Sequence, residues 1–382
     1  MAKPTIRFIG FDDEWEQRKI ADFTWDAGKR NKDDLDLEPY AITNEHGFIR
    51  QRDAHDDFGY MKDTDRKAYN IVQPNSFAYN PARINVGSIG YYKGVENVIV
   101  SSLYEVFQTD NYVNDRFLWH WLKSDEFPRW IEKLQEGSVR LYFYYDKLCE
   151  CQLYMPSLEE QEKIASFLDG LDHLITLHQR KCDETKKLKK YMLQKMFPQN
   201  GSKVPEIRLK GFTDEWEQRK LGNVAQEFKS GNSLKADEID ITGDYPVYGG
   251  NGLRGYTSTY NHDGEYALIG RQGALCGNMN YSAGKAYFTE HAVVVKADEN
   301  NDTSFLYYML DTMNLGQYSD QSAQPGLAVN KLVKLENSFP KKEEQQQIGT
   351  YFRSLDDLVT LHQHKCEELK KLKKFMLQNM FI

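Results

Sequence analysis

A 39-residue segment that occurs twice places the strongest constraint on the fold. The first copy, at residues 159–197, reads EEQEKIASFLDGLDHLITLHQRKCDETKKLKKYMLQKMF and aligns without a gap to residues 343–381, with 24 of 39 positions identical. Apolar residues recur in each copy at alternating steps of three and four, the spacing of a helix face that packs against another helix. Each copy predicts a helix of about 40 residues, ~60 Å long at 1.5 Å per residue. A single apolar stripe on so long a helix needs a partner, and the other copy is the simplest one.

The apolar stripe predicts which side chains meet between the two helices. The expected contact residues are Ile164, Phe167, Leu171, Leu174, His178, Thr185, Leu188 and Met192 in the first helix and Ile348, Tyr351, Leu355, Leu358, His362, Leu369, Leu372 and Met376 in the second. Cys182 and Cys366 each follow a stripe histidine by four residues, a spacing that suits either a metal site or a pair of polar residues that fixes helix register. The register role is the interpretation we favour.

The segment between the helices indicates their relative direction. It reads PQNGSKVPEIRLK at residues 198–210, and 13 extended residues reach at most ~45 Å, less than one helix length. An antiparallel pair needs only a local turn there, so we expect antiparallel helices and a pseudo-two-fold internal repeat.

A shorter repeat precedes each of two unlike inserts. GFDDEWEQRK at 10–19 recurs as GFTDEWEQRK at 211–220, an interval of 201, whereas the long segments repeat at an interval of 184. The chain therefore reads as short segment, insert and long helix, twice over. For Trp15 and Trp216 in the short repeat, packing against the ends of the long helices is favoured over contact with DNA.

Each insert is expected to be a small domain of mixed α and β structure, and the two inserts to be diverged versions of one domain. The expected strands are 97–107, 266–280 and 285–297, and the expected amphipathic helices are 115–134 and 303–313. The segments that suggest common ancestry are GSIG (87–90) with GRQG (270–273), FLWHWL (117–122) with FLYYML (305–310), and GSVR (137–140) with QSAQ (321–324).

Composition and missing motifs argue against several function classes. The net charge of −8 weighs mildly against nucleic acid as a partner, although it says nothing about how charge is distributed. The five cysteines are read as reduced thiols, and the absence of a long apolar run predicts a cytoplasmic protein with no membrane span. Neither a dinucleotide fingerprint nor a phosphate-binding loop is present, and Asn80-Pro81-Ala82 lacks the second proline and aromatic residue of an amino-methyltransferase motif. We therefore expect neither catalysis nor a bound cofactor or metal.

The repeated phrases resemble the specificity subunit of type I restriction-modification enzymes. They are IRFIGFDDEWEQRK and IRLKGFTDEWEQRK, followed by MPSLEEQEKIASFLDGLD and FPKKEEQQQIGTYFRSLD. The resemblance implies an α+β protein with two mixed α/β target-recognition domains, joined by two long antiparallel coiled-coil helices. It further implies that each domain reads half of a bipartite target in double-stranded DNA and that the helices dock methyltransferase (modification) subunits. The two-fold repeat suggests two such subunits, and restriction subunits complete the complex.

This resemblance, with the repeats, predicts a division of the chain into five segments. They are a first target-recognition domain at 1–152, a long helix at 153–197, a linker at 198–210, a second target-recognition domain at 211–336 and a second long helix at 337–382. A non-catalytic coiled-coil scaffold that reads no bases is the alternative, and a standalone enzyme is a more distant one.

Candidate base-reading residues are polar side chains near glycine-rich turns, because Arg pairs with guanine and Asn or Gln with adenine. The candidates are Arg83, Asn85, Ser88, Tyr91, Lys93 and Arg140 in the first insert and Arg254, Arg271, Gln272 and Gln324 in the second. Each can instead serve a hydrogen bond inside the fold. The lysine runs 186–190 and 370–374 are interpreted as solvated helix faces in preference to phosphate contacts.

Overall fold

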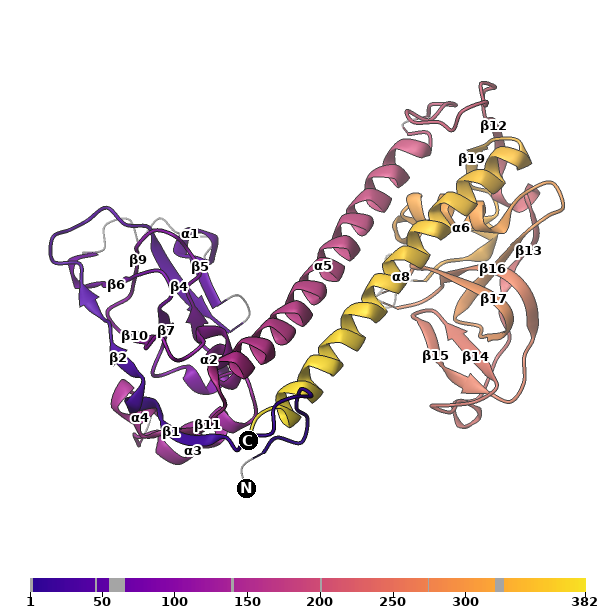
Figure 1. The fold of residues 1–382 in the computed structure, drawn as a ribbon. Coiled ribbons are helices and arrows are strands. Elements are labelled where there is room, and N and C mark those ends of the chain that lie inside the picture. Colours follow the sequence, from indigo (N-terminus) through magenta and orange to yellow (C-terminus); the bar gives the residue numbers. More distant parts are fainter. Residues whose placement is uncertain are drawn as a thin grey trace. The chain divides into compact units, whose positions relative to one another are not determined.

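The computed structural model describes residues 3–44, 47–54, 66–138, 141–199, 201–273, 275–319 and 326–382. The chain forms two compact units: unit 1 comprises Met1–Leu177 with Lys365–Ile382, and unit 2 comprises His178–His364. Each unit therefore holds one insert, part of one long helix and part of the other (Figure 1).

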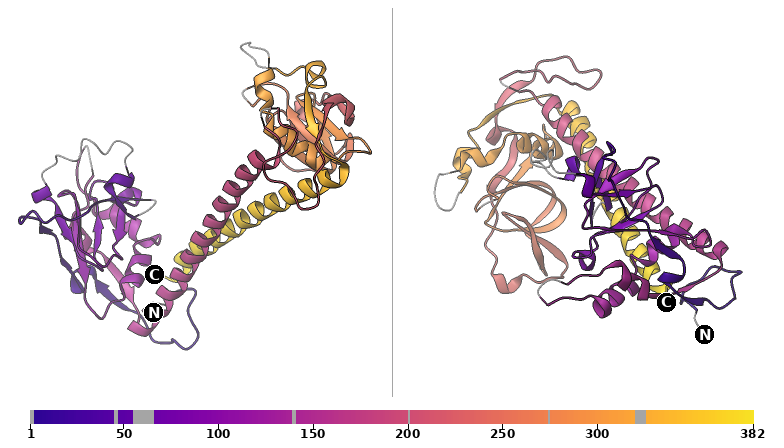
Figure 2. Two further views of the ribbon diagram at one scale, coloured as in Figure 1. Left: turned by 90° about the horizontal axis from the view of Figure 1, so that it is seen from above. Right: turned by 90° about the vertical axis from the view of Figure 1, so that its left-hand side faces the viewer.

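The two repeated segments form the helices α5 (Leu158–Met196) and α8 (Lys342–Asn379). In unit 1, Lys373 Nζ on α8 lies 2.5 Å from a carboxylate oxygen of Asp172 on α5. In unit 2, the matching residues exchange helices, and Lys189 on α5 lies 2.5 Å from Asp356 on α8. Late residues of each helix thus meet early residues of the other, so the predicted antiparallel pairing is confirmed, and Figure 2 shows the C-terminal end of α8 beside the start of α5.

The contact stripe between the helices was predicted only in part. Leu174 and Leu188 are 41% and 45% exposed, and Leu358 and Leu372, their equivalents 184 residues on, are exposed as well. The stripe instead includes the buried side chains Leu168, Cys182 and Met196 of α5 and Phe352, Cys366 and Met380 of α8. The predicted list had no residue between His178 and Thr185 or after Met192, and the apolar side chains of Cys182 and Met196 are buried there. At the place predicted for Leu188 the structure instead has Lys189, which pairs with Asp356.

The stripe histidines contact each other. His178 Nδ1 lies 3.0 Å from His362 Nδ1, so one ring donates a hydrogen bond and the other accepts it. Desolvation and the neighbouring His178 lower the pKa of His362. A side chain that pairs with its own repeat suits the register role.

The short repeat closes each insert next to a long helix. Its EQRK residues form β1 (Glu16–Lys19), antiparallel to β11 (Gln152–Met155), and in unit 2 β12 (Glu217–Lys220), antiparallel to β19 (Glu336–Phe339). The tryptophan before each strand is buried, with the Trp15 ring centroid 6.1 Å from Phe117 and the Trp216 centroid 6.3 Å from Phe197. Phe197 follows α5 directly, and Phe381, its equivalent after α8, packs on Phe117. The prediction that both tryptophans pack at helix ends is confirmed.

A buried ion pair ties the segment just before each short repeat to a long helix. Arg7 donates two hydrogen bonds to Glu160, at 2.7 and 2.8 Å, and Arg208 donates two to Glu344, at 2.8 and 2.7 Å. Each glutamate side chain is 1% exposed and each arginine 13%. This geometry explains why an arginine stands three residues before the repeated glycine and why the second glutamate of Glu-Glu-Gln recurs.

The glutamine of the same motif ties the helix to the insert. Gln161 Oε1 accepts a hydrogen bond from the backbone N–H of Asn114 at 2.9 Å, and Gln345 Oε1 accepts one from Asp302 at 3.0 Å. Asn114 is the N-cap of the helix that begins at Asp115, and Asp302 is the N-cap of the helix that begins at Thr303. The Glu-Glu-Gln motif therefore connects each long helix directly to its insert.

Unit 1 contains two further sheets, of strand order β2-β10-β7-β8 and β3-β6-β9-β4-β5. Their strands are β2 (Thr24–Asp26), β3 (Lys29–Arg30), β4 (Pro39–Thr43), β5 (Gly47–Arg50), β6 (Asn70–Val72), β7 (Phe77–Tyr79), β8 (Ile89–Tyr91), β9 (Val98–Val100) and β10 (Glu105–Thr109). The short helices are α1 (Gln51–Ala54), α2 (Asp115–Trp121), α3 (Glu126–Leu134) and α4 (Tyr145–Glu150). Phe77, Phe107 and Phe117 join β7, β10 and α2 in one apolar core with the start of α5.

Unit 2 contains one larger sheet, of strand order β13-β18-β16-β17-β14-β15. Its strands are β13 (Ala225–Ser230), β14 (Tyr245–Gly249), β15 (Gly252–Thr257), β16 (His262–Gly270), β17 (Met279–Phe288) and β18 (Ala292–Ala297), and the short helices are α6 (Thr303–Thr312) and α7 (Val329–Leu332). Helix α6 matches the predicted helix at 303–313.

Four predicted elements of the inserts are wrong in detail. The expected strand 97–107 is two strands, β9 and β10, that join different sheets. The expected helix 115–134 is split into α2 and α3, because Pro128 has no N–H for a helical bond to residue 124 and Ser124 Oγ bonds the carbonyl of Trp121 instead. The expected strands 266–280 and 285–297 are displaced, since β16 ends at Gly270 and β17 spans Met279–Phe288.

The hydrogen-bond registers show which parts of the two inserts correspond. In the first insert β10 pairs with β7 through Phe107 and Phe77, and in the second β18 pairs with β16 through Val295 and Ala267. The next strand is β8 beside β7 and β17 beside β16, so β8 corresponds to β17. This register matches GSIG (87–90) with GNMN (277–280), so its predicted match with GRQG was seven residues off. The match of 117–122 with 305–310 agrees with the register.

Candidate nucleic-acid interface

Two loops in equivalent positions carry five of the ten predicted base-reading residues. The first loop, residues 80–88, joins β7 to β8, and the second, residues 271–278, joins β16 to β17. Both make a left-handed turn at a glycine near the end, Gly87 at φ 85° and Gly277 at φ 89°. The turn at Gly277 excludes a side chain for a second reason, because an added Cβ would lie 2.3 Å from the backbone nitrogen of Gly316.

The first loop presents exposed polar side chains beside a cleft. Arg83 and Asn85 are exposed, and both line a cleft of about 720 Å³ together with Tyr142 and Tyr144, whose rings are stacked 5.5 Å apart. The loop is held from within, since the Arg83 N–H donates to the carbonyl of Asn80. A fixed backbone with free polar ends is what base-edge contacts require.

The second loop holds Arg271 through its backbone. The Arg271 N–H donates to the carbonyl of His291, and its own carbonyl accepts from Leu327, both at 2.9 Å. Its guanidinium makes a long hydrogen bond of 3.4 Å to the carbonyl of Glu290. Gln272 is exposed, with Oε1 3.0 Å from His291 Nδ1.

The turn between β14 and β15 brings Arg254 into the same region. Two glycines make this close approach possible: an added Cβ at Gly250 would lie 2.9 Å from the carbonyl oxygen of His291, and one at Gly249 would lie 2.6 Å from Cδ of Arg254. The structure thus brings Arg254, Arg271 and Gln272, predicted separately from the sequence, to one surface of unit 2.

Among the other predicted residues, Ser88 and Tyr91 serve the fold. Ser88 is 4% exposed and its Oγ donates to the carbonyl of Ile42 at 2.8 Å, so we remove it from the candidate interface. The Tyr91 hydroxyl lies 2.8 Å from Asp115 Oδ2 and 3.0 Å from Asn75 Oδ1, so its one proton can be donated to either, and burial raises its pKa. Lys93 is exposed. Arg140 and Gln324, whose equivalence rested on the 137–140 and 321–324 match, lie outside the described residues.

A second group of basic and aromatic side chains in unit 1 was predicted from the sequence only at Tyr91 and Lys93. A cleft of about 700 Å³ lies between β4, β5, β8, α2 and the long helices. It is lined by Tyr40, Asn44, Gly47, Phe48, Tyr91, Tyr92, Lys93, Gly94, Arg116, Trp119, Lys123, Asp172 and Lys373. No spacing rule predicts this group, because its members come from five separate segments that only the tertiary fold joins.

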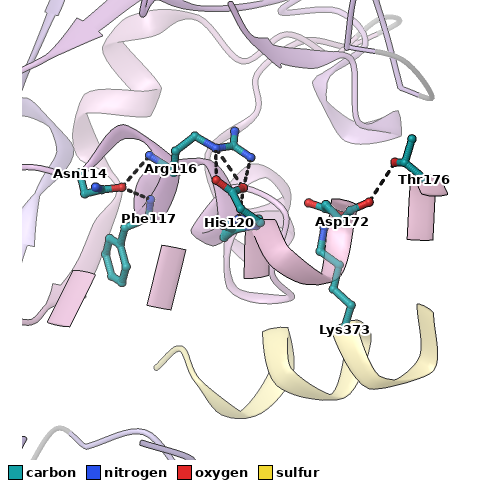
Figure 3. A network of polar contacts seen from close by, with 8 residues as sticks. Asn114, Arg116, Phe117, His120, Asp172, Thr176 and Lys373 are labelled. Atoms are coloured by element: carbon teal, nitrogen blue, oxygen red, sulfur yellow. Dashed lines mark hydrogen bonds and ion pairs between the residues drawn. The ribbon is translucent and has the colours of Figure 1, made fainter. Parts of the chain in front are cut away.

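The wall of this cleft contains a network of charged groups (Figure 3). Arg116 pairs with Asp169 through both Nε and Nη2, and His120 Nε2 lies 3.0 Å from the same carboxylate. Burial acts to raise the pKa of Asp169, but the hydrogen bonds from His120 and Arg116 outweigh it and hold this pKa well below its usual range. Burial lowers the pKa of His120.

Three of these residues have the composition of a metal site. His120, Asp169 and Asp172 offer ligand atoms that lie within 4.8 Å of one another. Arg116 already pairs with Asp169, and Lys373 already pairs with Asp172, so two cations of the chain balance both carboxylates. A divalent ion there would have to displace them, and the donor set therefore does not fit a resident metal.

Comparison with known proteins identifies the family of the chain. The model of the "Type I restriction modification DNA specificity domain" matches residues 12–187 and 213–371. The EcoprrI specificity subunit of Escherichia coli is 42% identical over 149 residues, which cover 38% of this chain and 37% of that protein. The MjaVIII specificity subunit of Methanocaldococcus jannaschii is 24% identical over 405 residues, covering 95% of this chain and 91% of that protein.

The fold is also that of a solved specificity subunit. The crystal structure of the type I restriction-modification S subunit from M. genitalium superposes with a TM-score of 0.70 at 17% identity, covering 100% of this chain and 99% of that one. None of the helices in the described ranges combines the length and the apolar character that a bilayer span requires. With two matches to the family model that together span most of its length, the chain belongs to the type I restriction-modification DNA specificity family.

Proposed function

We propose that this chain is the non-catalytic, DNA-reading subunit of a type I restriction-modification complex, and that each insert reads one half of a bipartite target. The observation that carries the proposal is the pair of matched loops, which the repeated scaffold holds in equivalent positions. One loop presents Arg83 and Asn85, and the other Arg271 and Gln272. Equivalent placement with different side chains is what two readers of unlike half-sites need, because Arg selects guanine and Asn or Gln selects adenine.

The proposal includes the division of labour along the chain. The target-recognition domains are residues 1–152 and 211–336, the long helices 153–197 and 337–382 set the spacing between half-sites, and the linker is 198–210. The complex forms in the cytoplasm with modification subunits and with restriction subunits.

Two modification subunits are proposed to dock on apolar patches of the long helices. Patch 1, in unit 1, is Leu174, Leu372 and Phe375, and patch 2, in unit 2, is Leu358, Leu188 and Tyr191, the equivalent residues of the other repeat. Their exposed fractions lie between 38% and 51%. Exposed apolar groups that recur in both repeats are typical of an interaction surface, and two equivalent patches favour two partners.

Charged substitutions in one patch should remove one modification subunit. We expect Leu188→Glu with Leu358→Glu to give a complex with a single modification subunit, because two buried carboxylates at the interface would lack partners. The equivalent pair in patch 1, Leu174→Glu with Leu372→Glu, is the matched variant and should give the same mass. Native mass spectrometry of the purified complexes measures this, and two subunits retained in both variants would exclude the patches as docking sites.

Substitution of one loop arginine should change one half of the target only. Arg271→Ala should relax or abolish one half-site, at ~1–3 kcal/mol for a lost bidentate contact, and Arg83→Ala should affect the other half. Sequencing of methylated DNA from both variants tests this, with melting temperatures as the control for folding. Loss of preference in both halves from a single substitution would argue against separate readers.

A further inference from the structure

We propose that the cleft between the first insert and the long helices holds a backbone phosphate of the DNA, with Lys123 as its principal donor. The inference rests on the proposed function and adds to it a contact in unit 1 that the repeat in unit 2 lacks. A phosphate contact carries no base preference, but it fixes the position of the base-reading loop on the duplex.

The charge in the cleft favours an anion. Lys93, Arg116, Lys123 and Lys373 line it, against the single carboxylate of Asp172. Asp172 pairs with Lys373, and Arg116 pairs with Asp169 behind the wall. Two lysines, Lys93 and Lys123, have no recorded carboxylate partner among the residues that the structure describes, although the chain as a whole carries a net charge of −8.

Lys123 is held where a ligand would meet it. Its Nζ lies 4.7 Å from the ring centroid of Trp119, and its recorded hydrogen bond is a long one, 3.3 Å to the carbonyl of Gly87. Burial, with the charge of Lys373 nearby, lowers the pKa of Lys123 to about 8. An anion in the cleft would raise the pKa of Lys123 again, because it supplies the missing counter-charge for the ammonium group.

The position of Lys123 links the cleft to base reading. Its hydrogen bond is to Gly87, the residue at which the first base-reading loop turns back into β8. Lys123 also lines a smaller neighbouring cleft together with Asn85 of that loop. A phosphate on Lys123 would therefore sit next to the loop that carries Arg83 and Asn85. Neighbouring phosphate and base contacts are the usual arrangement in sequence-specific DNA binding.

Unit 2 provides an internal comparison. Counted from the helix caps Asn114 and Asp302, the residue equivalent to Lys123 is Asp311, and the residue equivalent to Arg116 is Ser304. A carboxylate at the equivalent position repels phosphate. The contact is thus expected for one half-site only.

The test measures how duplex binding by the assembled complex of this chain with its modification subunits depends on salt. Lys123→Ala should reduce the slope of log affinity against log salt by about 0.9, the loss expected for one phosphate contact, and Lys123→Arg should preserve the slope. Lys133→Ala is the matched control, because Lys133 lies 4.7 Å over Trp130 on the next helix but is exposed and outside the cleft. It should leave the slope unchanged.

A second measurement identifies the phosphate. In duplexes that carry one neutral methylphosphonate at a time, one position should weaken wild-type binding and have no added effect on Lys123→Ala. If Lys123→Ala leaves both the salt slope and the methylphosphonate profile unchanged, the inference is overturned. It is also overturned if Lys123→Ala abolishes binding of inorganic phosphate without changing duplex binding. If the wild-type complex shows no preference for any DNA sequence, the proposed function itself fails, and that outcome is distinct from the first.

Discussion

Insertion of seven residues into both long helices, after Thr176 and Thr360, should abolish methylation at the natural target. Seven residues are two helical turns, so the insertion preserves the three- and four-residue spacing of the contact stripe. It lengthens each helix by about 10 Å, which corresponds to about three base pairs at 3.4 Å each. Three base pairs also rotate one half-site by nearly a third of a turn, so the readers could not both reach the original target.

The matched control for this experiment is the linker. Seven residues added after Gly201 precede Glu206 and Arg208, which contact the long helices, so these contacts should remain and methylation at the natural target should persist. Sequencing of methylated DNA distinguishes the two variants, and the melting temperature reports whether the lengthened helices still pair. Full methylation at the unchanged spacing by the lengthened chain would mean that the helices are docking surfaces with no measuring role.

Arg208→Ala should destabilise unit 2 by about 3–5 kcal/mol, because it leaves the carboxylate of Glu344 buried without its partner. That side chain is 1% exposed and its two recorded hydrogen bonds to Arg208 would be lost together. Chemical denaturation measures the loss. Arg7→Ala removes the equivalent pair with Glu160 and should have a similar effect on unit 1.

The double variant Arg208→Met with Glu344→Leu separates charge burial from packing. Removal of both charges avoids the unpaired carboxylate, so most of the stability lost in Arg208→Ala should return. If the double variant is as unstable as the single one, the pair stabilises the fold through shape and not through charge compensation.

The repeated parts of the chain were largely predictable from sequence because repetition supplies its own comparison. The two copies of each repeated segment predicted the helices and the packing of Trp15 and Trp216. The short linker between the first helix and the second insert predicted their antiparallel direction. The choice between two neighbouring apolar series was less certain, since Leu174 and Leu188 satisfy the same spacing as Leu168 and Cys182. Lys181 interrupts one series and Lys189 the other, so residue type alone does not distinguish them.

The candidate interface was predictable only in the exposed loops. Arg83, Asn85, Arg254, Arg271 and Gln272 follow from residue type and turn chemistry. A short sequence match cannot establish equivalence, which is why GSIG was paired seven residues away from its structural counterpart. The lysine-lined cleft was out of reach, because its charge depends on which carboxylates the fold pairs elsewhere.

The central claim is that the chain directs methylation to a target made of two separately read halves. The most direct measurement is single-molecule sequencing of DNA from cells that express this chain with its modification subunits. The account predicts one methylated motif with two specified segments and an unspecified spacer of fixed length between them. Methylation without a motif, or within one uninterrupted motif, would contradict it and favour a scaffold that reads no bases or a single reader.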